Sequence, residues 1–194
     1  MEILTTLGRT LGFSFAAGVN LYATVALLGL ASRYEWVSLP PQFQAFDNDW
    51  VIGAALVMYA VEFFADKIPY VDSLWDMIHT AIRPVGGALV AVTTLGDASP
   101  TTEALVMLLG GAVATSSHLT KTSTRAAANA SPEPFSNWAL SLGEDVFVVG
   151  LGFLALQYPL IALAVALVLL VLIAVFATVI VRTVKRWFAR RAVG

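Results

Sequence analysis

The residues best suited to chemistry lie between Glu62 and Pro84, in the stretch EFFADKIPYVDSLWDMIHTAIRP. Asp72, Asp76 and His79 follow one another at i, i+4 and i+7, so a helix would present all three on one face. Arg83 lies one turn further along the same face. Two carboxylates and an imidazole are suitable ligands for a divalent metal ion. The plainer interpretation is an interfacial helix with a solvated charged face.

Glu62 follows the apolar run ALVMYAV, which places it below the surface of any membrane that the chain crosses. An ionisable side chain at that depth is costly unless it is paired or functional. We expect Lys67 or Arg83 to be the partner of Glu62. Asp66 lies one helical turn after Glu62 and belongs to the same candidate site.

A second cluster is basic. His118, Lys121 and Arg125 are spaced at i, i+3 and i+7, so they share one helix face. Three potential cations on one face predict a site for an anionic group, such as a phosphate or a carboxylate. Alternatively, Lys121 and Arg125 only mark the end of a membrane span.

Two further features lie inside apolar segments. Glu144 and Asp145 are adjacent in SLGEDVFVVGLGFLAL, and both cannot face lipid, so at least one of them needs a partner. Asn20 lies in the middle of the first apolar segment, where we expect it to contact a substrate or a neighbouring helix. All of these residues are candidates for binding a substrate or an ion.

The composition identifies the class of protein that must position these residues. The chain has 194 residues, of which 58% are hydrophobic and 12% charged, and its mean hydropathy is +0.80. These values are typical of a polytopic membrane protein, and we expect residues 1–194 to form a single membrane domain. The net charge of -2 argues against nucleic acid as a partner. The absence of cysteine excludes disulfides, thiolate metal sites and a cysteine nucleophile.

The hydropathy pattern predicts an all-α protein with about six transmembrane helices. The expected spans are Leu11–Ala31, Val51–Ala65, Pro84–Gly96, Glu103–Thr120, Trp138–Leu156 and Leu160–Val181. The second and third are short for a span, so they are expected to extend into the polar stretch between them or to form re-entrant helices. With both termini cytoplasmic, every Lys and Arg except Arg33 falls on the cytoplasmic side.

The connectors suggest an internal repeat. SLPPQF with the following NDW resembles SPEPFSNW at residues 131–138, and each precedes an apolar span. Two halves of three spans each, residues 1–97 and 98–194, would form an inverted repeat, an architecture common among secondary transporters. The alternative is that Pro, Ser and Trp recur by chance where loops meet membrane helices.

Several long motifs carry a family resemblance. They are GFSFAAGVNLYATVALLGL, EFFADKIPYVDSLWDMIHTAIRP, GGALVAV, HLTKTSTRAAANASPEPFSN and SLGED, which together cover most of the chain. The chain thereby resembles an uncharacterised bacterial membrane family that carries only a domain-of-unknown-function label (forty-one twenty-six). The resemblance implies a multi-pass protein of the bacterial inner membrane and no particular activity. EFFADK is also loosely similar to the acidic motif of cation-exchanging transporters, but the spacing differs.

Three functions are consistent with these features. The first is a secondary transporter or permease for a small ion, solute or amphiphile, in which the three polar clusters meet in a cytoplasmic vestibule. The second is a membrane-embedded enzyme that acts on lipid head groups with a divalent cation at Asp72, Asp76 and His79; no other cofactor is expected. The third is a structural or assembly subunit. The expected partners are the lipid bilayer, a small substrate and, as an option, further copies of the chain.

Overall fold

The structure is a computed structural model that describes residues 1–129 and 135–191. Within these residues every regular element is helical, which confirms the all-α expectation. The elements are α1 (Glu2–Val19), α2 (Leu21–Arg33), the 3-10 helix η1 (Pro41–Phe46), α3 (Asp49–Ala65), α4 (Pro69–Leu95), α5 (Pro100–Asn129), α6 (Phe135–Gln157) and α7 (Pro159–Arg191).

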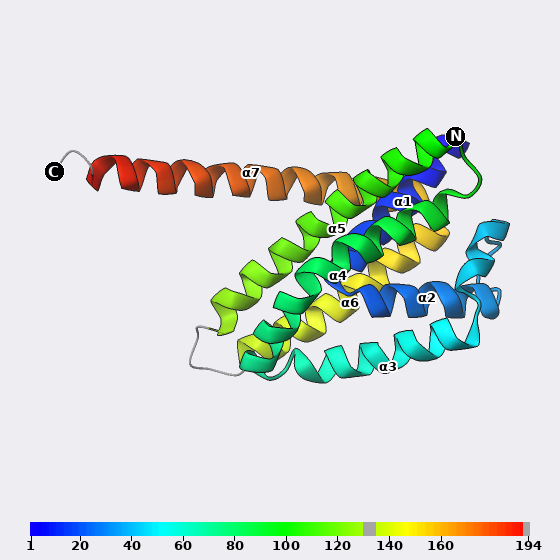
Figure 1. Ribbon diagram of the computed structural model, residues 1–194, viewed down its shortest axis with the longest axis horizontal. Coiled ribbons are helices and arrows are strands. Elements are labelled where there is room, and N and C mark those ends of the chain that lie inside the picture. Colours follow the sequence, from blue (N-terminus) through cyan, green and yellow to red (C-terminus); the bar gives the residue numbers. More distant parts are fainter. Residues whose placement is uncertain (130–134, 192–194) are drawn as a thin grey trace.

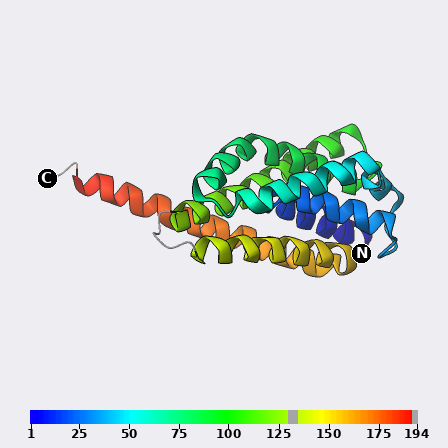
Figure 2. The ribbon, with the colours of Figure 1, turned by 90° about the horizontal axis from the view of Figure 1, so that it is seen from below.

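Helix α1 lies at the centre of the body. It packs against α4, α5, α6 and α7, and its side chains from Leu11 to Val19 are all buried. Figure 2 shows α1 and α2 between α3 and α4 on one side and α6 and α7 on the other. Beyond its first turns α7 leaves the body and extends alone toward the C-terminal end (Figure 1). The last turn of α1 therefore ends among the other helices of the body.

Small residues allow α1 to approach its neighbours closely. A Cβ atom on Gly18 would collide with the backbone of Ala114 and with the hydroxyl of Ser117, both on α5. A Cβ atom on Gly87 of α4 would likewise collide with Ala114. Close approach of helix backbones through small residues is the usual packing mode in membranes, where apolar burial does not drive helix association.

The distribution of side chains is the reverse of that in a water-soluble protein. Helix α4 buries Asp72, Asp76 and Arg83 and exposes Leu74 and Ile78. Helix α3 follows the same rule, with Glu62 fully buried beside exposed Val57, Val61 and Phe64. An apolar exterior around a charged interior is stable in a lipid environment, so the chain is a membrane protein.

Three described helices are long and apolar enough to cross a membrane: Pro69–Leu95, Phe135–Gln157 and Pro159–Thr183. Leu21–Arg33 is a shorter apolar helix. The expected spans near residues 138–156 and 160–181 coincide with α6 and with most of α7, and Val51–Ala65 coincides with α3. The total of six spans and the inverted repeat stay predictions, and residues 131–134 of the second connector lie outside the described residues.

The first expected span, Leu11–Ala31, is wrong as a single helix. The chain breaks at Asn20, whose φ of -147° and ψ of 100° are extended, and α2 begins directly afterwards. The Asn20 side chain accepts a hydrogen bond from the Ala23 amide at 2.9 Å, and the backbone N–H of Asn20 donates to the Ala16 carbonyl. Asparagine favours such a break because its side chain can replace the hydrogen bonds that a helix end leaves open.

The third expected span begins at Pro84, and the expectation that it extends into the preceding polar stretch is confirmed. Pro69 is the first residue of α4, a position where its fixed φ suits a helix start. Helix α4 then continues through Pro84 to Leu95, so the polar face and the third apolar segment form one helix of 27 residues. A single helix carries both the candidate site and a membrane span.

An exposed ion pair joins the end of α2 to the start of α3. Arg33 Nε donates to Asp47 Oδ1 at 2.8 Å, and Arg33 Nη1 lies 2.7 Å from Asp49 Oδ1. The hydrogen bonds that Arg33 donates, first to Asp47 and then to Asp49, raise the pKa of Arg33 above its ordinary value. Exposed pairs contribute little to stability, so this contact positions the connector more than it stabilises the fold.

The packing of α1 can be tested with two glycine substitutions. Gly18→Ala should lower the free energy of unfolding by about 3 kcal/mol, because the new methyl group meets backbone atoms that cannot move aside. Gly150→Ala on α6 is the control, since a Cβ there has no neighbour within 4 Å. Thermal unfolding in detergent, followed by size-exclusion chromatography, measures both. Equal melting temperatures for the two variants would contradict this packing.

Candidate functional site

Six charged side chains form a continuous series of ion pairs, which we call the charge chain. In order, with alternating sign, they are Arg83, Glu62, Lys121, Asp66, Arg125 and Glu144. The successive nitrogen to oxygen distances are 2.6, 3.0, 3.1, 2.9 and 2.9 Å. The charge chain thus connects α3, α4, α5 and α6.

The spacing of residues along two helices explains why the charge chain forms. Glu62 and Asp66 are one turn apart at the end of α3, and Lys121 and Arg125 are one turn apart on α5. Residues at i and i+4 lie on the same face of a helix, so two acids on one helix can meet two bases on the other. Lys121 Nζ bridges both acids, at 3.0 Å from Glu62 Oε1 and 3.1 Å from Asp66 Oδ2.

The charge chain is almost completely removed from solvent. Arg83 and Glu62 have 0% exposed surface, and of the six side chains Glu144 is the most accessible, at 15%. Buried charges are tolerated only when they are paired and hydrogen-bonded. Each of the three cations has a carboxylate partner within the charge chain, and among the buried nitrogens of these cations Arg83 Nε lacks a hydrogen bond.

His118 is a neutral link between the charge chain and α4. Arg83 Nη1 can only donate, so His118 Nδ1, at 2.8 Å, accepts this hydrogen bond. The ring proton of neutral His118 is therefore on Nε2, which donates to Thr80 Oγ1 at 3.0 Å. His118 is not a cation in this arrangement.

His79 lies between two aromatic side chains. Its ring stacks on Trp75 at 4.6 Å between centroids, and its Nδ1 donates to the Trp75 carbonyl at 2.7 Å. The Tyr22 hydroxyl lies 2.9 Å from Nε2 and donates to it when the ring is neutral. Tyr22 thereby connects α2 to the polar face of α4.

The basic face on α5 is occupied by carboxylates. Lys121 contacts Glu62 and Asp66, and Arg125 donates to Asp66, to Glu144 and to the side chain of Asn137. No donor of this face is left for a phosphate or carboxylate ligand without breaking these pairs. The structure therefore gives no support to the predicted anion site.

Asp145 connects α6 to the break between α1 and α2. Its Oδ1 accepts a hydrogen bond from Asn20 Nδ2 at 3.4 Å, so Asn20 does contact a neighbouring helix. Of the two partners predicted for Glu62, Lys67 or Arg83, the structure shows Arg83. Lys67 Nζ donates instead to the Phe63 carbonyl and, at 3.3 Å, to the hydroxyl of Ser141 on α6, one turn before Asp145.

Carboxylates outnumber cations in this region. Within the described residues it contains the carboxylates of Glu62, Asp66, Asp72, Asp76, Glu144 and Asp145. Its cations are Arg83, Lys121, Arg125 and, at the edge and only half-buried, Lys67. One oxygen on each of five carboxylates lacks a hydrogen-bond partner: Glu62 Oε2, Asp66 Oδ1, Asp72 Oδ1, Asp76 Oδ1 and Asp145 Oδ2. Protons or a bound cation would compensate this surplus.

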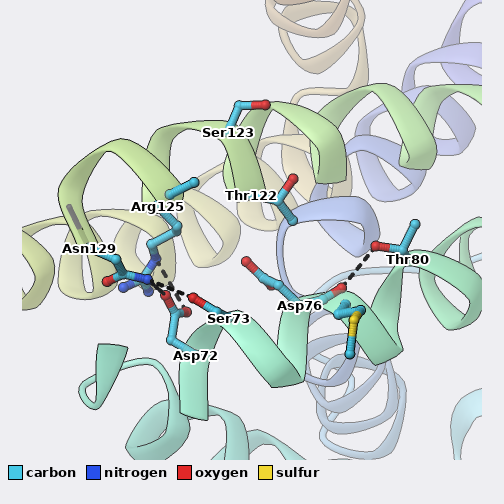
Figure 3. A pocket seen from close by; sticks show the side chains of 10 residues that line it. Asp72, Ser73, Asp76, Thr80, Thr122, Ser123, Arg125 and Asn129 are labelled. Carbon is cyan, nitrogen blue, oxygen red and sulfur yellow. Dashed lines mark hydrogen bonds and ion pairs between the residues drawn. The ribbon is translucent and has the colours of Figure 1, made fainter. Parts of the chain in front are cut away.

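A pocket of about 360 Å³ opens beside the charge chain, between α4 and α5 (Figure 3). Its walls are formed by Asp72, Ser73, Asp76, Met77, Thr80, Thr122, Ser123, Arg125, Ala126 and Asn129. Asn129 Nδ2 donates to Asp72 Oδ2 at 2.7 Å and closes one end. In the described part of the chain no group of three or more His, Cys, Asp or Glu side chains is arranged to hold a metal ion, the set of Asp72, Asp76 and His79 included.

The structure thus brings the three polar clusters of the sequence together around α5, with Asn20 beside Asp145 and Lys67 at the margin. Sequence reasoning missed Asn129, Asn137 and Ser141. Asn137 and Ser141 precede Asp145 by eight and four residues, so their helical spacing was a usable signal. Asn129 follows Lys121 and Arg125 at the same helical spacing, which indicated its face but not its contact with α4.

Comparison with known proteins gives one match. The profile of the family described as "Domain of unknown function (DUF4126)" matches residues 7–179. No curated protein matches the chain, and no solved structure does.

The charge chain predicts a large effect of neutralising one member. Glu62→Gln should lower the free energy of unfolding by about 3–5 kcal/mol, because Arg83 and Lys121 lose their shared carboxylate in a buried site. Glu35→Gln, at an exposed position, is the matched control and should change it by less than about 0.5 kcal/mol. Chemical unfolding in detergent, monitored by tryptophan fluorescence, compares them. A Glu62→Gln protein as stable as the control would refute the pairing.

Proposed function

We propose that this chain, which belongs to the family described as a domain of unknown function (DUF4126), is a secondary transporter for a small ion or solute, coupled to protons or another cation. The observation that carries the proposal is the surplus of buried carboxylates inside a membrane bundle. Ionisable groups at membrane depth are costly, and in membrane proteins they commonly mark ion pathways and proton relays. A purely structural network would be expected to balance its charges.

The break between α1 and α2 supports the same function. Helix α1 ends in the interior, where the Gly18 carbonyl accepts a hydrogen bond from Arg83 Nη1 at 3.2 Å. The next two residues lead directly to Asn20 and its contact with Asp145. Interrupted helices whose ends and carbonyls line the binding site are a recurrent feature of secondary transporters.

Asp145 is the best candidate for the group that exchanges a proton or cation during transport. Among the six carboxylates, it is the one without an ion-pair partner in the described part of the chain. Its Oδ2 has no hydrogen-bond partner, whereas its Oδ1 contacts the interrupted helix through Asn20. A change of charge at Asp145 would therefore act directly on the junction between α1 and α2.

The distribution of most Lys and Arg residues supports an orientation in an inner membrane in which the charge chain and pocket open toward the cytoplasm. The start of α1 then lies at the opposite end, because Arg9 lies over the Phe43 ring of η1, so the predicted cytoplasmic N-terminus does not fit this orientation. Alternating access would then require a movement that opens the Asp145 region toward the other side. The short connectors that join α2, η1 and α3 lie at the end of the molecule opposite the charge chain.

Transport can be measured on the purified chain in proteoliposomes. Rapid solution exchange on a supported membrane, with a panel of inorganic cations and small organic solutes, should give transient currents that depend on the pH gradient. Asp145→Asn should reduce them by about tenfold or more, because the amide cannot exchange a proton. Asp97→Asn, in an exposed connector, should leave them unchanged. Folded wild-type protein that gives no current and no solute flux with any member of the panel would overturn the proposal.

A further inference from the structure

The pocket between α4 and α5 contains buried acceptor atoms that lack donors. Asp72 is 0% and Asp76 4% exposed, and both line the pocket. The Oδ1 atoms of both side chains have no hydrogen-bond partner, and neither has Oδ1 of Asn129 at the end of the pocket. Figure 3 shows the Asp76 side chain extending from α4 into the space that faces α5. Arg83 Nη1 lies 3.6 Å from Asp76 Oδ1 and Arg125 Nε lies 3.9 Å from Asp72 Oδ1, which is too far for a hydrogen bond. Buried acceptors without a hydrogen bond are costly, so this site favours a ligand that donates hydrogen bonds.

The hydroxyl groups of the pocket present acceptors as well. Ser73 donates to the Pro69 carbonyl at 3.0 Å, and Thr80 donates to the Asp76 carbonyl at 2.9 Å. Thr122 donates to the carbonyl of Leu119 at 3.1 Å. The hydroxyl protons of these three side chains are therefore already committed to the backbone, which leaves oxygen lone pairs as their free hydrogen-bonding capacity.

Arg125 does not make the pocket attractive to anions. Its guanidinium donates to Asp66, Glu144 and Asn137, all of which lie away from the pocket walls. Asn129 Nδ2 is likewise engaged with Asp72 Oδ2. The polar atoms of the pocket that stay available are carboxylate, amide and hydroxyl oxygens. An ammonium group, with three donors and no acceptor, complements these oxygens.

The size and lining of the pocket favour an organic cation over a bare metal ion. A volume of about 360 Å³ is within the usual range for small-molecule sites, and Met77 and Ala126 supply apolar wall for a carbon skeleton. Only two carboxylates reach the pocket, and the described residues contain no metal-ligating group of three or more acidic, His or Cys side chains. We propose that this pocket binds a small organic primary ammonium ion, with its charged end against Asp72 and Asp76.

This inference deepens the proposed function and rests on it for the role of the ligand as a transported substrate. Binding itself does not require transport, so calorimetric titration of the detergent-solubilised chain tests it separately. The probes are ethanolamine, ethylene glycol as its neutral analogue, and Na⁺ and Mg²⁺ as inorganic cations. Ethanolamine should bind, and ethylene glycol should bind at least about a hundredfold more weakly, because it lacks the charge that the carboxylates compensate.

Two variants locate the site. Asp76→Asn should weaken ethanolamine binding by about tenfold or more, through loss of one carboxylate charge. Ala126→Leu leaves every charge in place and should weaken binding because the larger side chain occupies the pocket. This second variant keeps the test valid if the Asp76→Asn protein does not fold. Asp97→Asn, outside the pocket, should bind as the wild type does.

Each alternative result has a definite meaning. Equal binding of ethylene glycol, tighter binding of Na⁺ or Mg²⁺ that displaces ethanolamine, or no binding at all would overturn the ammonium site. Ethanolamine binding that neither pocket variant alters would place the ligand elsewhere and overturn it too. Binding of ethanolamine without transport of any solute would overturn the proposed function and leave the site standing. Proton-coupled flux without ammonium binding would overturn this inference alone.

Discussion

The structure depends on the requirement that buried charges be paired. Glu62 and Arg83 have no contact with solvent, and each lies where an unpaired charge would cost several kcal/mol. Their pairing is possible only if α3, α4 and α5 meet at one depth, since Lys121 must reach both Glu62 and Asp66. The charge chain therefore fixes how α3, α4 and α5 are aligned along their axes. Sliding any one of them by one turn would leave a cation or a carboxylate without its partner. The hydrophobic exterior contributes little to this specificity, since lipid contacts any apolar side chain equally well.

Function and stability place opposite demands on this region. Each buried cation of the charge chain has a carboxylate partner, although Arg83 Nε lacks a hydrogen bond, whereas Asp72, Asp76 and Asp145 retain oxygens without a hydrogen-bond partner. Such groups are costly in a membrane unless a proton or ligand completes them, and this is the physical argument that links the network to transport. The charge chain holds the helices in register, and the incompletely paired carboxylates lie around it, at the pocket and at the interrupted helix.

Much of the candidate site was predictable from the sequence, because its residues follow helical periodicity. The shared faces of Asp72, Asp76 and His79 and of Lys121 and Arg125 required only i, i+3 and i+4 spacing. The choice of partners was not predictable. Lys67 is closest to Glu62 in sequence but turns toward α6, whereas Lys121 and Arg83 reach it from other helices. The basic face on α5 is likewise paired with carboxylates from the end of α3 and from α6, which its own spacing did not indicate.

Local pattern alone was sufficient for the all-helical membrane architecture and for which side chains face inward, since both follow from the apolar content and from the geometry of a single helix. Only the packed molecule decided that the chain breaks at Asn20, that α4 runs unbroken through Pro84, and that Asp72 and Asp76 line a pocket against α5. The physical reason is that these features depend on contacts between residues far apart in the chain. Asn20 and Asp145 are 125 residues apart, and no local spacing could have indicated that they touch.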